Sequence, residues 1–185
     1  MPFHVSRFEW SFNKITGKNP SSVLDVDLSE YAQLKTPIQK AKFIKRLMDD
    51  LLSKTSKTVA QKIMRECGSV YQSGVSQCVS VPMIKKAKKL YKESRDIKEL
   101  LTKFNEHHIG GRNLRLEGDV IKASYKRCYC GAVSKTKEKI PLTYCYCGAG
   151  WFKRIFEEAL SKPVKVEVLQ TIANGADTCE FKIHI

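Results

Sequence analysis

The chain has 185 residues, of which 42% are hydrophobic, and 33 Lys and Arg against 19 Asp and Glu give it a formal net charge of +14. This length is enough to bury a real core in one domain, so two independent domains are not expected. No run of about 18 apolar residues is present, and the start lacks a charged segment followed by an apolar stretch. We therefore expect no membrane span and no signal peptide, and a cytoplasmic protein.

The positive charge raises the expectation of a nucleic acid, an anionic membrane surface or an acidic protein as partner, without choosing among them. Lysines cluster in residues 40–46, 85–92 and 135–139, where they alternate with apolar positions. That alternation is typical of solvated helix faces. A plain basic surface is therefore the simplest interpretation, with nucleic-acid binding as an alternative.

Residues 1–35 are expected to form an N-terminal arm packed against the body, with a lid or dimer contact as the alternative. Its apolar residues fall partly at the period of two expected for a strand. They are Phe3, Val5, Phe8, Trp10 and Phe12. Residues 36–185 are then expected to be a single α+β domain, helical over 36–109 and built on a sheet with a metal site over 112–185.

Four helices are predicted in the helical part from start signals and apolar residues at helical spacing. The start signals are Thr36-Pro37, Ser56 or Thr58, Pro82, and Asp96 with Glu99. The second helix is expected to stop at Gly68, and residues 69–80 to form a loop. Ile38 and Tyr91 are expected to face inward. His107 and His108, in the last turn of the fourth helix, are expected to be capping or surface groups.

The sheet part begins with a predicted hairpin that turns at Gly118-Asp119. Residues 134–140 form a lysine-rich loop, expected to be a hydrophilic finger tip. A short amphipathic helix should follow Gly150 and end before Pro163. The alternating residues 164–168 and 179–185, joined by an Asn174-Gly175 turn, predict a terminal hairpin with one buried face.

A duplicated motif carries four of the seven cysteines: Cys128-Tyr129-Cys130-Gly131-Ala132 recurs as Cys145-Tyr146-Cys147-Gly148-Ala149. Two thiolates one residue apart can turn onto one ion, and a second pair completes the tetrahedral set that zinc prefers. The glycine after each pair is expected to let the chain curl as in a zinc-ribbon knuckle, although ribbon pairs are separated by two residues. Structural zinc is predicted, with an unliganded reduced cluster, disulfides or an iron–sulfur cluster as alternatives.

Four cysteine ligands would close the coordination shell, which argues against metal-assisted hydrolysis. Seven cysteines, an odd number, indicate reduced thiols and metal rather than a disulfide framework. Cys67 and Cys179 are expected in the interior, and Cys78 in a loop. A redox pair of Cys67 and Cys78 stays open.

Residues 144–185 resemble the 4-vinyl reductase domain, within the superfamily that includes haem-type nitric-oxide sensors and small TRAPP subunits. The resemblance is carried by Gly175 and the Cys-x-Phe-x-Ile signature of Cys179, Phe181 and Ile183. Such domains often have a further cysteine before the glycine, where this chain has Thr171. The resemblance implies helices packed on one antiparallel sheet, an apolar small-molecule ligand, and often a dimer.

The last part is also similar to the L-2-amino-thiazoline-4-carboxylate hydrolase-like proteins, a resemblance that implies a ring-opening hydrolase. The leading interpretation is a binding or sensory module for a small molecule with a structural four-cysteine zinc site. Phe104, Trp151 and Phe156 are its candidate pocket residues.

Two alternatives stay open. A hydrolase would have to use Cys67, Cys78, His107 or His108, whose spacing matches no catalytic motif. A basic zinc module would bind nucleic acid through residues 135–139, where no aromatic residue offers a base a stacking surface.

Overall fold

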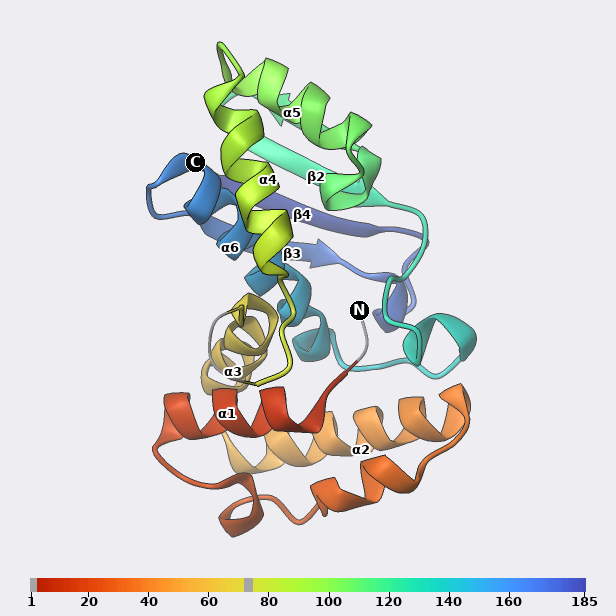
Figure 1. Ribbon diagram of the computed structural model, residues 1–185. Helices are drawn as coiled ribbons and strands as arrows, with labels where there is room; N and C mark the ends of the chain where they lie inside the picture. The colour runs from red at the N-terminus through yellow and green to blue at the C-terminus, as the bar shows by residue number, and fades with distance from the viewer. Residues whose placement is uncertain (1–2, 72–74) are drawn as a thin grey trace.

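The computed structural model describes residues 3–71 and 75–185, and over these ranges the protein has the α+β architecture that the sequence predicts. Figure 1 shows a layer of N-terminal helices at the bottom and a sheet with its own helices above it. The helices are α1 (Val5–Thr16), α2 (Pro37–Lys54), α3 (Lys57–Ser69), α4 (Val81–Lys92), α5 (Ile97–Glu106) and α6 (Tyr146–Leu160). The strands are β1 (Leu114–Glu117), β2 (Val120–Tyr125), β3 (Lys165–Gln170) and β4 (Cys179–His184).

The sheet is antiparallel throughout, in the order β1-β2-β4-β3. Its register aligns Ile121 with Ile183 and Ala123 with Phe181, and all four side chains are buried. Because side chains alternate along a strand, Lys122 and its partner Lys182 point to the opposite face. One face is therefore apolar, and it forms a hydrophobic core with α4, α5 and α6.

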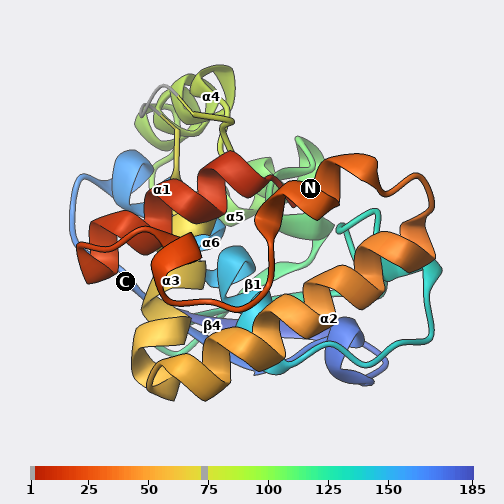
Figure 2. The ribbon, with the colours of Figure 1, turned by 90° about the horizontal axis from the view of Figure 1, so that it is seen from below.

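The predicted strand character of the N-terminal arm is wrong, because residues 5–16 form helix α1. Phe8 and Phe12 are four residues apart, lie on one helix face and are fully buried. Short 3₁₀ turns at Pro20–Ser22 and Leu28–Gln33 lead on to α2. Seen from below, α1 and α2 lie in front, and part of α6 is visible between them (Figure 2). These helices, with α3, build a second hydrophobic core.

The predicted helix starts are confirmed for α2, α3 and α5, and α4 begins one residue before Pro82. Thr36 caps α2 reciprocally: its Oγ1 accepts from the Gln39 N–H at 3.2 Å, and Gln39 Oε1 accepts from the Thr36 N–H at 3.0 Å. The predicted inward orientation is wrong for Ile38 and Tyr91, which are 53% and 40% exposed. No helix within the described ranges is long and apolar enough to cross a membrane. The predicted loop of residues 69–80 includes residues 72–74, which lie outside the described part.

Helix α6 begins at Tyr146, four residues before the predicted glycine boundary. Gly150 is inside the helix because α6 crosses α3 there at very short range. A Cβ atom on Gly150 would lie 1.8 Å from the carbonyl oxygen of Arg65, and one on Gly68 would lie 1.8 Å from that of Cys147. The two glycines thus allow backbone-to-backbone contact, and this contact fixes the start of α6.

Glu158 of α6 connects three segments of the upper layer. Its carboxylate accepts a hydrogen bond from the Tyr71 hydroxyl at 2.9 Å and forms ion pairs with Lys88 at 2.7 Å and Arg154 at 3.4 Å. The Glu158 side chain is only 17% exposed, so these interactions are partly shielded from water. The Lys88 ammonium, with help from Tyr71, holds the pKa of Glu158 below its usual value near 4.5.

Replacing Glu158 with glutamine is expected to lower the free energy of unfolding by about 1.5 kcal/mol at pH 7. Because the folded pKa is depressed, this contribution is full above the unfolded pKa and is lost as the pH falls through the folded pKa. Urea unfolding should therefore show a clear difference between wild type and Glu158→Gln at pH 7 that shrinks below about pH 4.5. Glu93→Gln, which removes an exposed carboxylate 3.7 Å from Lys89, should change stability little at either pH.

Candidate ligand pocket and cysteine cluster

The four predicted metal ligands meet at one place. Cys128 and Cys130 follow β2, Cys145 ends a 3₁₀ turn, and Cys147 lies in the first turn of α6. All four line a cavity of about 50 Å³, here called the cysteine cavity. Cys179 of β4 lines the same cavity. The sequence placed Cys179 in the interior, which is confirmed, but gave no sign that it joins the others.

Polar groups accompany the thiols. The Tyr144 hydroxyl lies 2.9 Å from Cys130 Sγ, and the Ile172 N–H donates to Cys179 Sγ at 3.4 Å. The Thr171 hydroxyl lies in the cavity wall next to Cys145, is 1% exposed, and has no hydrogen-bond partner of ordinary geometry in the described part of the chain. An orphaned buried hydroxyl is costly unless something in the cavity completes its hydrogen bond.

Burial strongly disfavours the thiolate forms. It raises the pKa of Cys128 to about 11 and of Cys145 to about 12, and it raises the pKa of Cys147 well above its usual value. With only protein groups around them, these cysteines are therefore protonated at neutral pH. Neutral thiols are poor nucleophiles, so burial lowers the reactivity of these three cysteines.

The chemical type of the side chains favours a metal site, but their present arrangement does not. Four thiols on one small cavity are the ligand type that zinc and iron–sulfur clusters take. Across residues 3–71 and 75–185, however, no group of three or more His, Cys, Asp or Glu side chains is arranged closely enough to hold an ion. Metal binding would require the cysteine side chains to turn inward together, and zinc stays a prediction.

The predicted curl of the chain is wrong for the second pair, whereas the chain does turn after the first pair, where the Ser134 N–H donates to the Cys130 carbonyl at 2.8 Å. Gly148 lies inside α6 and packs toward the Phe181 ring, so it does not turn the chain. Gly131 has no atom within 4 Å of the position of an added Cβ, so nothing there demands glycine. The two copies of the motif thus have different structures.

The predicted lysine-rich loop between the pairs does face water, but both of its ends are anchored to the body. Val133 and Ile140, near the two ends of the loop, are buried in the second hydrophobic core, which α1, α2 and α3 build. The Ile140 N–H donates to the Ala173 carbonyl at 2.7 Å, and Asn174 Nδ2 donates to the Ile140 carbonyl at 3.3 Å. Only the residues between these anchors, including the lysines, face water, so the segment lies flat against the body.

The remaining candidates for catalysis are two cysteines and two histidines outside the cluster. All seven cysteines are in the described part, and none forms a disulfide there. Cys67 is buried beside Arg7 of α1, and burial raises the pKa of Cys67 and raises that of Cys78 to about 11. His107 and His108 are exposed, as predicted. Burial therefore disfavours the thiolate form of Cys67 and of Cys78.

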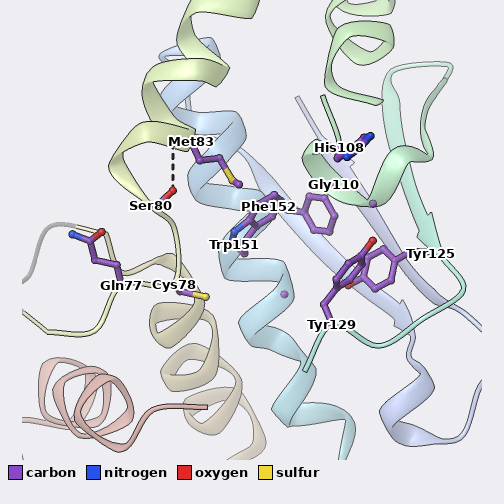
Figure 3. Close-up of a pocket in the computed structure, with 12 residues that line it drawn as sticks. Gln77, Cys78, Ser80, Met83, His108, Gly110, Tyr125, Tyr129, Trp151 and Phe152 are labelled. Carbon is purple, nitrogen blue, oxygen red and sulfur yellow. Dashed lines mark hydrogen bonds between the residues drawn. The ribbon is translucent and has the colours of Figure 1, made fainter. Parts of the chain in front are cut away.

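A second and larger cavity adjoins the cluster. It measures about 280 Å³ and is here called the apolar pocket. Figure 3 shows it between α4, α6 and the segment that carries His108 and Gly110, with Trp151 and Phe152 as one wall and Tyr125 and Tyr129 facing them. Met83 borders it from α4, whose first turn is held by a hydrogen bond from the Met83 N–H to Ser80 Oγ.

Of the three candidate pocket residues, Trp151 lines the apolar pocket. Phe104 and Phe156 are fully buried, and their ring centroids lie 5.6 Å apart, so they belong to the core. The sequence missed the two tyrosines on the facing wall. The sequence signal that could have indicated Tyr129 is its position between two cysteines. On its own, that position predicts only a metal site.

Tyr129 connects the cysteine cavity to the apolar pocket. It lies between Cys128 and Cys130 in the chain and lines both cavities, as do Tyr125 and Gly148. The rings of Tyr125 and Tyr129 meet edge to face with centroids 5.1 Å apart. Any change that moves the first cysteine pair therefore moves a wall of the pocket.

These features define a small α+β protein whose helices and sheet enclose an apolar pocket next to a cysteine cluster. Residues 12–185 match the family of unknown function DUF6144, and the chain belongs to this family. Comparison with curated proteins gives no match. Among solved structures, the chain is similar to a trafficking protein particle complex subunit 3 from Naegleria fowleri, covalently bound to palmitic acid. The identity is 11%, with 80% of this chain and 93% of that chain covered and a TM-score of 0.49.

Proposed function

We propose that this protein is a binding module for an apolar small molecule, with the four-cysteine cluster as a structural zinc site beside the binding pocket. The observation that carries the proposal is the apolar pocket itself. Its volume of about 280 Å³ is near the lower end of the roughly 300–1,000 Å³ range of small-molecule sites. Aromatic walls with a few polar groups at the rim are the usual composition of such sites.

The surroundings of the pocket support a preformed site. Phe152 packs against Phe181 with ring centroids 5.1 Å apart, and Trp151 packs edge to face on Phe152 at 5.3 Å. Gly110 has a positive φ of 76°, and a Cβ there would lie 3.0 Å from the Phe152 ring. Walls supported in this way need little reordering when a ligand enters, which favours affinity.

The structural role of the cysteines is supported by what they connect. The first pair follows the central strand β2, and the second pair lies at the crossing of α6 with α3. One ion held by both pairs would fasten the sheet to the helix that forms the back of the pocket. The buried Thr171 hydroxyl would then donate to a ligand thiolate, as polar groups around zinc sites commonly do.

The neutral fluorophore N-phenyl-1-naphthylamine is the probe for this function. We expect its fluorescence to rise on binding, and Trp151→Ala to weaken its affinity about tenfold because a large aromatic contact is lost. Met83→Trp, which fills the pocket from its rim, should abolish binding. The readout is a fluorescence titration of each variant.

The chain offers a matched control, since it has two tryptophans and Trp10 lies in α1, away from the pocket. Trp10→Ala should retain wild-type affinity. Unfolding curves of all variants separate loss of the fold from loss of the site. Equal affinities of Trp151→Ala and Trp10→Ala, or no binding by the wild type, would refute the proposal.

A further inference from the structure

The apolar pocket continues into a second depression with a different chemical character. This depression, here called the basic groove, has a volume of about 620 Å³ and runs along the segments 108–113 and 124–129. His108, Gly111, Tyr125 and Tyr129 line both the groove and the pocket. The pocket and the groove therefore adjoin along these four residues.

Arg112, Lys126 and Arg127 line the groove, and its lining contains no Asp or Glu. On other surfaces, some lysines and arginines form ion pairs with carboxylates, as Lys45 does with Asp49. None of the three groove cations forms an ion pair with any carboxylate in residues 3–71 and 75–185. Their charges are therefore available to an incoming anion.

The backbone holds this charge next to the pocket. His108 and Arg112 have φ values of 60° and 69°, in the left-handed region that residues other than glycine seldom adopt. Gly111 between them has φ 89°, and a Cβ there would lie 2.9 Å from the Tyr125 ring. The segment is thus held against Tyr125, with an Arg112 guanidinium nitrogen 3.1 Å from His108 Nδ1.

On the other side of the groove, the Arg127 guanidinium lies over the Tyr129 ring, 4.8 Å from its centroid. A cation stacked on an aromatic face is partly oriented before any ligand arrives. The groove is therefore lined by one arginine from the segment before β1 and one from the segment after β2.

We propose that the ligand is an amphipathic anion, with its apolar body in the apolar pocket and an acidic head group in the basic groove between Arg112 and Arg127. This inference rests on the proposed function, because the pocket must first take an apolar body. Lys126 adds a third positive charge, and guanidinium groups recognise the planar or tetrahedral oxygens of carboxylate, sulfonate and phosphate heads.

The test compares two probes with the same ring system. N-Phenyl-1-naphthylamine is neutral, and 8-anilinonaphthalene-1-sulfonate adds one sulfonate. At low salt, the wild type should bind the sulfonate about tenfold more tightly than the neutral probe, as two or three exposed charge contacts can provide. Raised salt should erase most of this preference. Arg112→Gln/Arg127→Gln should bring sulfonate affinity down to that of the neutral probe.

Arg115→Gln/Lys122→Gln is the matched control. It removes two positive charges that face each other across β1 and β2, outside the lining of the groove, and should retain the preference. Equal, salt-independent binding of both probes would overturn the head-group inference and leave the proposed function standing. Binding of neither probe would overturn both.

Two competitors complete the design. Methanesulfonate, which has the head group without the ring system, should not displace the sulfonated probe at matched concentration. Displacement would mean that the groove binds anions independently of the pocket, and it would overturn the inference. The second competitor is a single-stranded oligonucleotide. If the wild type bound the oligonucleotide but not the sulfonated probe, and Arg112→Gln/Arg127→Gln no longer bound the oligonucleotide, the groove would be a nucleic-acid contact and the inference would be overturned.

Discussion

Replacing Gly150 with alanine is expected to lower the free energy of unfolding by about 3 kcal/mol or more. In an ordinary helix interior, this change would stabilise by up to about 1 kcal/mol, because alanine is the better helix former. Here the added methyl group would lie 1.8 Å from the Arg65 carbonyl oxygen and 3.1 Å from the Ser69 nitrogen. Both are backbone atoms, so α3 and α6 would have to separate.

Urea unfolding monitored by circular dichroism measures this effect, and two other glycines calibrate it. Gly131→Ala should change stability by less than about 0.5 kcal/mol, since nothing lies within 4 Å of its added methyl group. Gly148→Ala should be intermediate, because its nearest neighbour is the edge of the Phe181 ring at 3.0 Å. If Gly150→Ala were as stable as Gly131→Ala, the close crossing of the two helices would be wrong.

The same crossing explains why the sequence misplaced the start of α6. Two glycines within three residues, Gly148 and Gly150, are normally read as breaking a helix, and the prediction accordingly began the helix after Gly150. The reason for glycine here is a neighbour distant in sequence, namely α3 at Gly68. Local pattern carries no information about such a contact.

Elements with strong local signals were predicted well. The Thr36 cap of α2, the Asp96 cap of α5 and the alternating strand that contains Phe181 each depend on residues close in sequence. The N-terminal helix was predicted wrongly because its local signal is ambiguous: Phe8, Trp10 and Phe12 fit a period of two as well as part of a helical face. Only packing against α2 and α3 decides between them.

The candidate site was predictable only in part. Duplication of an unusual pattern is visible in sequence, and the four cysteines of the repeated motif, Cys128, Cys130, Cys145 and Cys147, line one cavity. Their role as ligands of one ion stays a prediction. The apolar pocket draws its walls from α4, α6, β2 and the loops after α5 and β2, and no spacing rule joins such distant segments. Trp151 is predictable as a pocket residue only because it is a large aromatic residue. The same criterion also selects Phe104 and Phe156, which belong to the core.

The freshly purified, reduced protein is expected to carry one zinc ion per chain, and loss of that ion should destabilise the protein strongly. Structural zinc contributes roughly 10–16 kcal/mol in small peptides, against a total domain stability of about 5–15 kcal/mol. Cys128→Ser/Cys145→Ser removes one ligand from each pair. Native mass spectrometry should find the variant without metal, and its free energy of unfolding should fall by more than about 4 kcal/mol.

Because Tyr129 lines both cavities, the metal-free protein should also lose affinity for N-phenyl-1-naphthylamine. Cys78→Ser is the control: it alters a thiol outside the cysteine cavity and should retain both the ion and most of the stability. An iron–sulfur cluster would instead give iron, sulfide and visible colour. A wild-type protein that contains no metal, together with a Cys128→Ser/Cys145→Ser variant of normal stability, would show that the cysteine cavity is an unliganded cluster of buried thiols.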